Sequence, residues 1–318
     1  MQNFSLLSFL ENNISLDEPF ILGCSTGADS MFLLYKILET PYRKNLIAAY
    51  FNHNTRKQCK EEESFLLKIG KKEGFKVEIW ECDFEKIKAL YPSKSFEELA
   101  REKRYQFFDA LCHIHKAEKV LLAHHLDDRI ETMLFNMLRG TKLTGLINMQ
   151  EKSGNILRPL LSIEKRDILE FLKKNKLKYF EDKTNRENIY TRNFIRNEII
   201  PKVSEVHPEY KKNISQLLKY FESLKNHIDR EVSDFLKTQE SLLKNKKCFS
   251  INWFLQLTNF LQKEVIRIIY FWENNNSTFG LTEWNIKEII RFIGGRNNNT
   301  IKEIHRLKMK KQWDLIFY

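Results

Sequence analysis

The chain has 318 residues, which is long for one compact domain and favours two. Its 53 lysines and arginines outnumber its 42 aspartates and glutamates, giving a formal net charge of +11 at pH 7. A basic excess favours polyanionic partners such as nucleic acids. The alternative is that an AT-rich genome has raised the lysine content, in which case many of these lysines are solvated surface residues without a partner role. No apolar run approaches the roughly 18–20 residues of a membrane span, so no membrane partner is expected.

The amino-terminal residues and the cysteines indicate a reducing compartment. Residues 1–20 lack the basic start of a signal peptide and carry acidic residues early. The cysteines are odd in number, widely scattered and form no CxxC, so no zinc site, iron–sulfur site or disulfide framework is predicted. They are Cys24, Cys59, Cys82, Cys112 and Cys248. We therefore expect a cytoplasmic protein, or one of the equivalent organellar compartment.

The chain opens with an apolar strand, a short loop and a helix. The strand is predicted at 20–22, and apolar residues recur at helical spacing after residue 30. The loop between them consists of Ser25, Thr26, Gly27, Ala28, Asp29 and Ser30. Backbone N–H groups at a helix N-terminus attract anions, so this loop predicts a phosphate site. The alternative is an ordinary Ser or Asp N-cap after a core strand, which the loop alone does not exclude.

Strands and helices continue to alternate through the first half of the chain. Strands are predicted at 46–54, 77–83 and 120–125, and helices at 60–75 (closed by Gly74), 96–115 and 127–138 (closed by Gly140). Repeated βα units of this length predict an α/β fold with a parallel, doubly wound sheet. Ligands bind at the carboxyl ends of such strands, so the motifs STGADS, FNHNTR and AHHLDD are expected to share one crevice.

The strand signal fades after residue 163. Helices are predicted at 163–176, 190–200, 209–239, 260–273 and 283–292, with short strands in 301–318. Pro201 and Pro208 frame a predicted hinge, since proline restricts the residue before it and interrupts helices. The sequence thus predicts a catalytic α/β domain at 1–202 and a second, smaller, mainly helical domain at 203–318.

Two carboxylates stand out at the last strand-to-helix junction. Asp128 and Glu131 are one helical turn apart and should point from one face of the helix. Such a pair can bind an ammonium group, hold Mg²⁺ or act as a general base. The alternative is that Asp127 and Asp128 complement the helix dipole while Glu131 pairs with Arg129 or a lysine. HHLDD lacks the HExxH spacing of zinc proteases.

Ordered motifs along the first two hundred residues resemble a known family. The loop STGADS resembles the SGGxDS loop of PP-loop ATP pyrophosphatases, with Thr26 where that family usually has glycine. Threonine resists backbone angles that glycine permits, but its hydroxyl can meet a phosphate. Together with six further blocks, the chain resembles the tRNA(Ile)-lysidine synthetase family within the PP-loop enzymes. These blocks are 52–56, 97–108, 123–132, 138–146, 158–161 and 179–201.

The resemblance implies an ATP-dependent ligase that forms a C–N bond. It would join L-lysine to the wobble cytidine of the CAU anticodon of isoleucine tRNA through an adenylated cytidine, releasing AMP and pyrophosphate. Its cofactors would be ATP and Mg²⁺, and a homodimer is compatible with it. The alternatives are another PP-loop tRNA-modifying enzyme such as a thiolase, for which no cysteines here are suitably spaced, or a non-catalytic RNA-binding descendant.

The resemblance also assigns residue roles. Residues 25–30 would bind ATP, with Asp29 at a metal (Mg²⁺) or ribose contact. His125, Asp128 and Glu131 would bind lysine, and catalysis would use Asp128, Glu131, Arg101 and Arg104. The residues implied to bind tRNA are Arg139, Arg192, Asn193 and Arg196.

Overall fold

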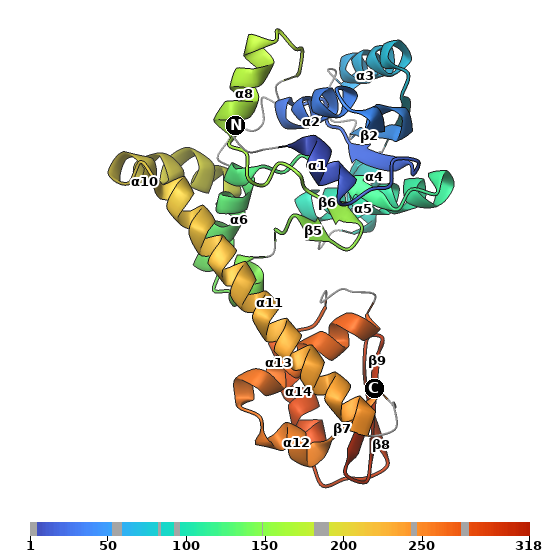
Figure 1. Cartoon of the computed structure of the whole chain (residues 1–318), viewed down its shortest axis with the longest axis vertical. Helices are drawn as coiled ribbons and strands as arrows, with labels where there is room; N and C mark the ends of the chain where they lie inside the picture. The colour runs from blue at the N-terminus through green and yellow to red at the C-terminus, as the bar shows by residue number, and fades with distance from the viewer. Residues whose placement is uncertain are drawn as a thin grey trace. The chain divides into compact units, whose positions relative to one another are not determined.

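The computed structural model describes residues 5–52, 59–81, 84–91, 96–147, 149–180, 191–242, 247–274 and 280–318 (Figure 1). Contacts between Cα atoms divide the chain into two units, Met1–Leu218 and Lys219–Tyr318. Within the described part of the chain, no helix is both long and apolar enough to cross a membrane.

The first unit is built on a six-stranded sheet with the order β3-β2-β1-β4-β6-β5. Strands β3, β2, β1, β4 and β6 run parallel, and β5 pairs antiparallel with β6. The strands are β1 (Phe20–Gly23), β2 (Leu46–Asn52), β3 (Lys76–Glu81), β4 (Lys119–Leu121), β5 (Lys152–Ser153) and β6 (Ile156–Leu157). The predicted α/β class with a doubly wound parallel sheet is confirmed. The last two strands were not predicted, because two residues are too short to show a periodicity.

Helices precede, connect and follow these strands. They are α1 (Leu6–Glu11), α2 (Ala28–Leu38), the 3₁₀ helix η1 (Pro41–Asn45), α3 (Cys59–Glu73), α4 (Phe84–Leu90), α5 (Phe96–His115), α6 (Leu126–Leu138), α7 (Leu143–Leu146) and α8 (Lys165–Lys174). Gly74 and Gly140 follow α3 and α6 with φ of +80° and +73°, which confirms both as helix terminators.

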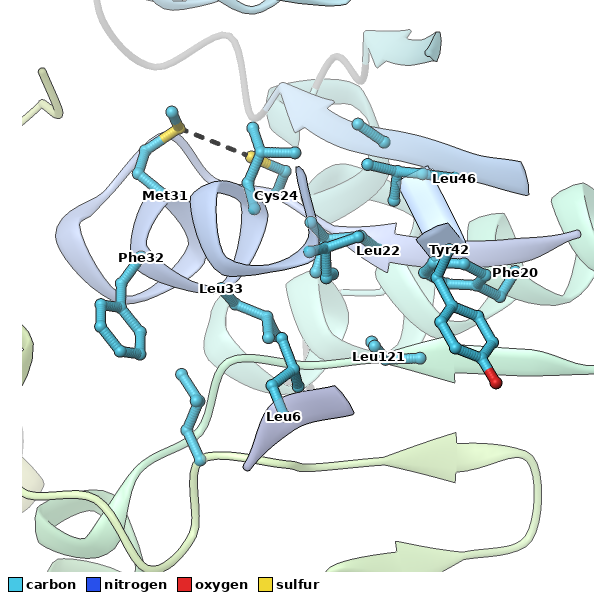
Figure 2. Close-up of a cluster of buried hydrophobic side chains, with 14 of the residues drawn as sticks. Leu6, Phe20, Leu22, Cys24, Met31, Phe32, Leu33, Tyr42, Leu46 and Leu121 are labelled. Carbon is cyan, nitrogen blue, oxygen red and sulfur yellow. Dashed lines mark hydrogen bonds between the residues drawn. The ribbon is translucent and has the colours of Figure 1, made fainter. Parts of the chain in front are cut away.

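Apolar side chains from both faces of the sheet form two buried clusters. On one face, Leu22 and Leu121 pack with Leu6 of α1 and Leu33 of α2 (Figure 2). On the other, strand residues such as Ile21 pack against α5. Every residue of β2 is buried, as expected for a strand covered on both faces. The sheet therefore holds its carboxyl ends on a rigid scaffold.

A continuous helical run follows residue 191. It comprises α9 (Thr191–Phe194), a π-helical turn η3 (Ile195–Ile199) and α10 (Ile200–Val206). The prediction that this helix ends at residue 200 is wrong, because the run continues through Pro201 by way of the π turn that precedes it. Pro208 lies between α10 and α11 (Tyr210–Leu242), and α11 begins in the first unit and ends in the second.

The second unit combines helices with a small antiparallel sheet. Its helices are the rest of α11, α12 (Ile251–Gln256), α13 (Asn259–Glu273) and α14 (Glu283–Gly294). Its sheet has the order β7-β10-β9-β8, formed by β7 (Cys248–Ser250), β8 (Thr300–Ile304), β9 (Leu307–Gln312) and β10 (Leu315–Phe317). The short strands predicted near the end are confirmed, and β7 joins them from an earlier segment that gave no strand signal. Phe249, Phe254 and Tyr270 lie in its core.

Candidate active site

The loop between β1 and α2 is closed by its own hydrogen bonds. The backbone N–H of Ser25 donates to Ser30 Oγ at 3.1 Å, and that hydroxyl donates to the carbonyl of Gly27 at 3.1 Å. Gly27 is the N-cap of α2 and makes no side-chain cap bond, so the alternative of a Ser or Asp N-cap is wrong. With no side chain as cap, the N-terminus of α2 can receive an anion.

Thr26 takes an unusual backbone conformation at the centre of this loop. Its φ is +59°, the left-handed region that β-branched residues rarely enter. The side chain is fully buried, and its hydroxyl donates to the carbonyl of Ser25 at 2.6 Å. The expectation that this hydroxyl meets a phosphate stays a prediction, since here its proton is donated to the Ser25 carbonyl. Thr26 has kept the glycine-like backbone at the cost of local strain.

Asp29 extends from the first turn of α2 toward two cations. Its Oδ1 lies 2.5 Å from Lys165 Nζ, at the start of α8, and 3.6 Å from His125 Nε2. Burial alone would raise the pKa of the Asp29 carboxyl, but the hydrogen bond and charge of His125, together with Lys165, lower it below its ordinary value. Asp29 is therefore ionised at neutral pH.

His125 begins α6 through a reciprocal cap. Its Nδ1 accepts from the backbone N–H of Asp128 at 3.4 Å, and Asp128 Oδ2 accepts from the backbone N–H of His125 at 3.0 Å. Burial alone would lower the pKa of His125, but the carboxylates of Asp29 and Asp128 raise it above its ordinary value. The cap thus fixes the imidazole between two carboxylates.

Asp128 and Glu131 lie on one face of α6, as predicted, and they share a cation. Arg196 of η3 donates from Nε to Glu131 Oε1 at 2.6 Å and from Nη2 to Glu131 Oε2 at 2.7 Å. The same Nη2 lies 3.4 Å from Asp128 Oδ1. Burial raises the pKa of both carboxyls. The nearby positive charges oppose this rise without cancelling it, His125 and Arg196 at Asp128, and Arg196 at Glu131. We call His125, Asp128 and Glu131 the carboxylate cluster.

Contacts between helices hold Arg196 and Asp127 in place. Leu126 and Ile130 of α6 share a buried cluster with Tyr210, against which α10 packs. Asp127 accepts from the backbone N–H of Lys165 at 2.8 Å and from Lys211 Nζ at 2.6 Å. These bonds lower the pKa of Asp127 against the opposing effect of burial. Asp127 is thus a structural anchor between α6 and α8.

A second cluster, of arginines, surrounds the neighbouring His124. Arg158 Nε donates to His124 Nδ1 at 3.2 Å, and Arg101 stacks on the Tyr105 ring at 5.0 Å from its centroid. Burial, followed by the charges of Arg158, Arg104 and Arg101, lowers the pKa of His124 to about 3. His124 is therefore neutral, with Nδ1 as acceptor and the proton on Nε2. We call Arg101, Arg104, Arg158 and His124 the arginine cluster.

Two of the residues implied to bind tRNA lie on a separate surface of α6 and α9. The guanidinium groups of Arg139 and Arg192 lie over the Phe135 ring at 5.1 and 5.3 Å from its centroid. Exposed apolar side chains flank them at Met137, Leu138 and Phe194. Asn193 is partly buried on α9. The fourth implied residue, Arg196, is paired with the carboxylate cluster instead.

Sequence reasoning missed several residues at this sheet edge. Lys165, Arg158 and Lys211 were not singled out, and His124 had no assigned role. Arg158 opens the block 158–161, which was a usable signal, but Lys165 lies 136 residues from Asp29 and nothing local connects them. Of the motif at 52–56, Asn52 is described and donates to Glu63 Oε1 at 2.5 Å. Residues 53–56, and Tyr190 beside α9, lie outside the described residues.

A family model described as a PP-loop domain matches residues 3–203. The chain belongs to the PP-loop family. Among curated relatives of this PP-loop protein, the tRNA(Ile)-lysidine synthase of Thermotoga maritima is 32% identical over 256 residues, covering 78% of this chain and 61% of the relative. That of Staphylococcus aureus (strain COL) is 35% identical over 201 residues, covering 61% and 46%. The chain thus spans about half to three-fifths of the length of these relatives.

A solved structure supports the fold alone. A U34-tRNA thiolase from Methanococcus maripaludis, with its [4Fe-4S] cluster, matches with a TM-score of 0.54 and 19% identity, covering 66% of this chain and 73% of the thiolase. In the described part of this chain, no group of three or more His, Cys, Asp or Glu side chains is placed to hold a metal ion. Cys24, Cys59 and Cys248 are buried, and burial raises the pKa of Cys24 to about 11.

Proposed function

We propose that this PP-loop protein is a tRNA(Ile)-lysidine synthase. It would use ATP to join L-lysine to the wobble cytidine of the CAU anticodon of isoleucine tRNA, releasing AMP and pyrophosphate. The observation that carries the proposal is the pair Asp128 and Glu131 beside the PP-loop. Burial raises the pKa of both carboxyls, and both already contact the side-chain cation of Arg196. The names of the curated relatives support the same reading.

In the first step, the loop and the arginine cluster would act on ATP and the cytidine. Backbone N–H groups at the start of α2 would hold the phosphates while the cytidine oxygen attacks the α-phosphorus and pyrophosphate leaves. Arg101 and Arg104 would contact the activated base or phosphate. Mg²⁺ usually binds through one or two carboxylates and nucleotide phosphates, and it neutralises phosphate charge. Asp29 fits that role, being ionised and at the loop.

In the second step, the carboxylate cluster would act on lysine. Asp128 and Glu131 would receive the side-chain ammonium, and a carboxyl with a raised pKa is suited to remove its proton. The freed amine would attack the ring carbon that carries the adenylate, and AMP would leave with the former carbonyl oxygen. His125 would position Asp128 through the reciprocal cap.

The tRNA would contact both parts of the chain. Arg139 and Arg192, stacked on Phe135, present two guanidinium groups on an exposed surface where phosphates and bases can bind. We assign catalysis to residues 1–202 and further tRNA contacts to the mainly helical part, 203–318. Residues 219–318 contain 17 lysines and arginines against 11 aspartates and glutamates, a composition suited to a polyanion.

Incubation with ATP, radiolabelled lysine and a transcript of isoleucine tRNA with a CAU anticodon tests the proposal. We expect label in the tRNA that depends on ATP and disappears when the wobble cytidine is replaced by uridine. Absence of lysine label, with ATP still cleaved in a tRNA-dependent way, would instead indicate another tRNA-modifying activity of the PP-loop family.

A further inference from the structure

The cation on the paired carboxylates is a side chain of the protein itself, and it fills the position that lysine would need. We propose that Arg196 is a tethered substitute for the lysine ammonium, which keeps the lysine site closed until tRNA withdraws it. This inference rests on the proposed function, because it assumes that Asp128 and Glu131 are the lysine site. It adds an order of binding, with tRNA before lysine.

The geometry makes occupation by Arg196 and by lysine mutually exclusive. Both oxygens of Glu131 accept from one guanidinium, at 2.6 and 2.7 Å, and Asp128 Oδ1 lies 3.4 Å from the same group. A bidentate pair of this kind is among the stronger polar contacts in proteins. An incoming ammonium would bring a second positive charge to the same oxygens, so it must displace the guanidinium rather than join it.

The segment that carries Arg196 has an irregular helical turn whose register can change. Arg196 lies in the π-helical turn Ile195–Ile199. Such turns are rare in helices, and those that occur often lie at functional sites. Pro201 accounts for it, because proline cannot donate to the carbonyl four residues earlier and clashes with it in a regular α-helix. A one-residue change of register in a helix turns a side chain by roughly 100° about the axis. Such a change would carry Arg196 off the carboxylates.

The same segment also carries the surface that we assign to tRNA. Arg192 lies four residues before Arg196 and is exposed, stacked on Phe135. The Arg196 side chain is 39% exposed while it is paired, so a phosphate can approach it. A tRNA phosphate would compete for it with the two carboxylates. Binding of tRNA to this segment would thereby open the lysine site.

Equilibrium dialysis of radiolabelled lysine against the full chain, without ATP, tests the inference. Without tRNA, we expect Arg196→Met to bind lysine at least tenfold more tightly than wild type, since methionine keeps an aliphatic chain but no charge. Lys202→Met, which removes an exposed positive charge from α10 in the same helical run, is the matched control and should bind lysine as wild type does. Equal lysine affinity of wild type and Arg196→Met would overturn the inference.

A second measurement uses wild-type protein alone and does not depend on the variant folding. Binding linkage is reciprocal, so if tRNA tightens lysine binding tenfold, saturating lysine must tighten tRNA binding tenfold. Lysine affinity that tRNA leaves unchanged, in protein that still transfers lysine to tRNA, would refute the closed site while leaving the proposed function intact. Protein that transfers no lysine to tRNA would refute the proposed function itself.

Discussion

Two histidines that are adjacent in the chain, His124 and His125, have opposite electrostatic surroundings. Arginines surround His124 and, with burial, lower its pKa to about 3, whereas carboxylates raise the pKa of His125. The backbone at His125 is extended, with φ of −119° and ψ of −179°, so successive side chains point in opposite directions. One strand end therefore separates a cationic region from an anionic one within two residues.

This separation matches the two steps of the proposed reaction. A cationic region suits phosphate groups and the negative charge that develops on adenylation. An anionic region with raised carboxyl pKa values suits a substrate that arrives as an ammonium and must lose a proton. A substitution in one region should therefore impair one step and spare the other.

Changing the paired carboxylates to amides should abolish lysine transfer without unfolding the protein. We expect Asp128→Asn and Glu131→Gln each to lower the rate of lysine incorporation into tRNA by about 10²–10⁴-fold, the usual contribution of a positioned base. Asp167→Asn on α8, whose carboxylate pairs with the neighbouring Arg166, is the control and should incorporate lysine normally. Near-normal incorporation by both amide variants would remove the pair from the mechanism.

Loss of the charge on Asp29 should impair the ATP step. We expect Asp29→Asn to lower tRNA-dependent pyrophosphate release by about 10²-fold, comparable with removing one electrostatic stabiliser at a reacting group. Ser30→Ala should also lower it, but through the loop, because the Ser30 hydroxyl is buried and bridges Ser25 and Gly27. Wild-type pyrophosphate release by Asp29→Asn would show that the loop assignment is wrong.

The two histidines should contribute opposite pH dependences to stability. The unfolded chain protonates His124 near pH 6.5, but the folded protein does so only near its pKa of about 3. Its contribution to the free energy of unfolding is therefore full above pH 6.5 and lost as the pH falls toward 3. His125, with a raised folded pKa, contributes below pH 6.5 and loses that contribution as the pH rises through the folded value.

Denaturant titrations across this pH range measure both contributions. We expect His124→Asn to flatten the decline of stability below pH 6.5, and His125→Asn to flatten a decline above it. Identical slopes for the two variants would mean that the histidines share one environment, contrary to the structure.

The smallest expected effect concerns the strained loop residue. Thr26→Gly removes a β-branched side chain at φ +59° and should raise the free energy of unfolding by about 1 kcal/mol. The relief of backbone strain is worth roughly 1–3 kcal/mol, and the larger conformational entropy that glycine loses on folding offsets part of it. Thr26→Ala keeps the strain and loses the hydroxyl bond to Ser25, so it should destabilise the protein. A destabilising Thr26→Gly would mean that packing of the buried side chain outweighs its strain.

Local patterns in the sequence predicted much of the first unit, but they could not predict contacts between residues far apart in the chain. Helix α5 was predicted at its observed bounds, because its apolar residues repeat at helical spacing over many turns. Strand β4 was predicted through 125 but ends at Leu121, the last of its residues that pairs with β1 and β6. The face shared by Asp128 and Glu131 follows from helical spacing, yet their cation, Arg196, comes from 65 residues later. Arg196 lies in the π turn just before Pro201, a proline that we interpreted from the sequence as part of a hinge.

One partial reaction tests most directly whether the two regions carry the two steps. With [α-³²P]ATP and tRNA, Glu131→Gln should build up labelled adenylated tRNA, because the arginine cluster is intact and lysine transfer is blocked. Arg104→Ala should give little labelled tRNA. Accumulation of label in Arg104→Ala but not in Glu131→Gln, or equal labelling in the two variants, would contradict the division of the site into an adenylation region and a lysine region.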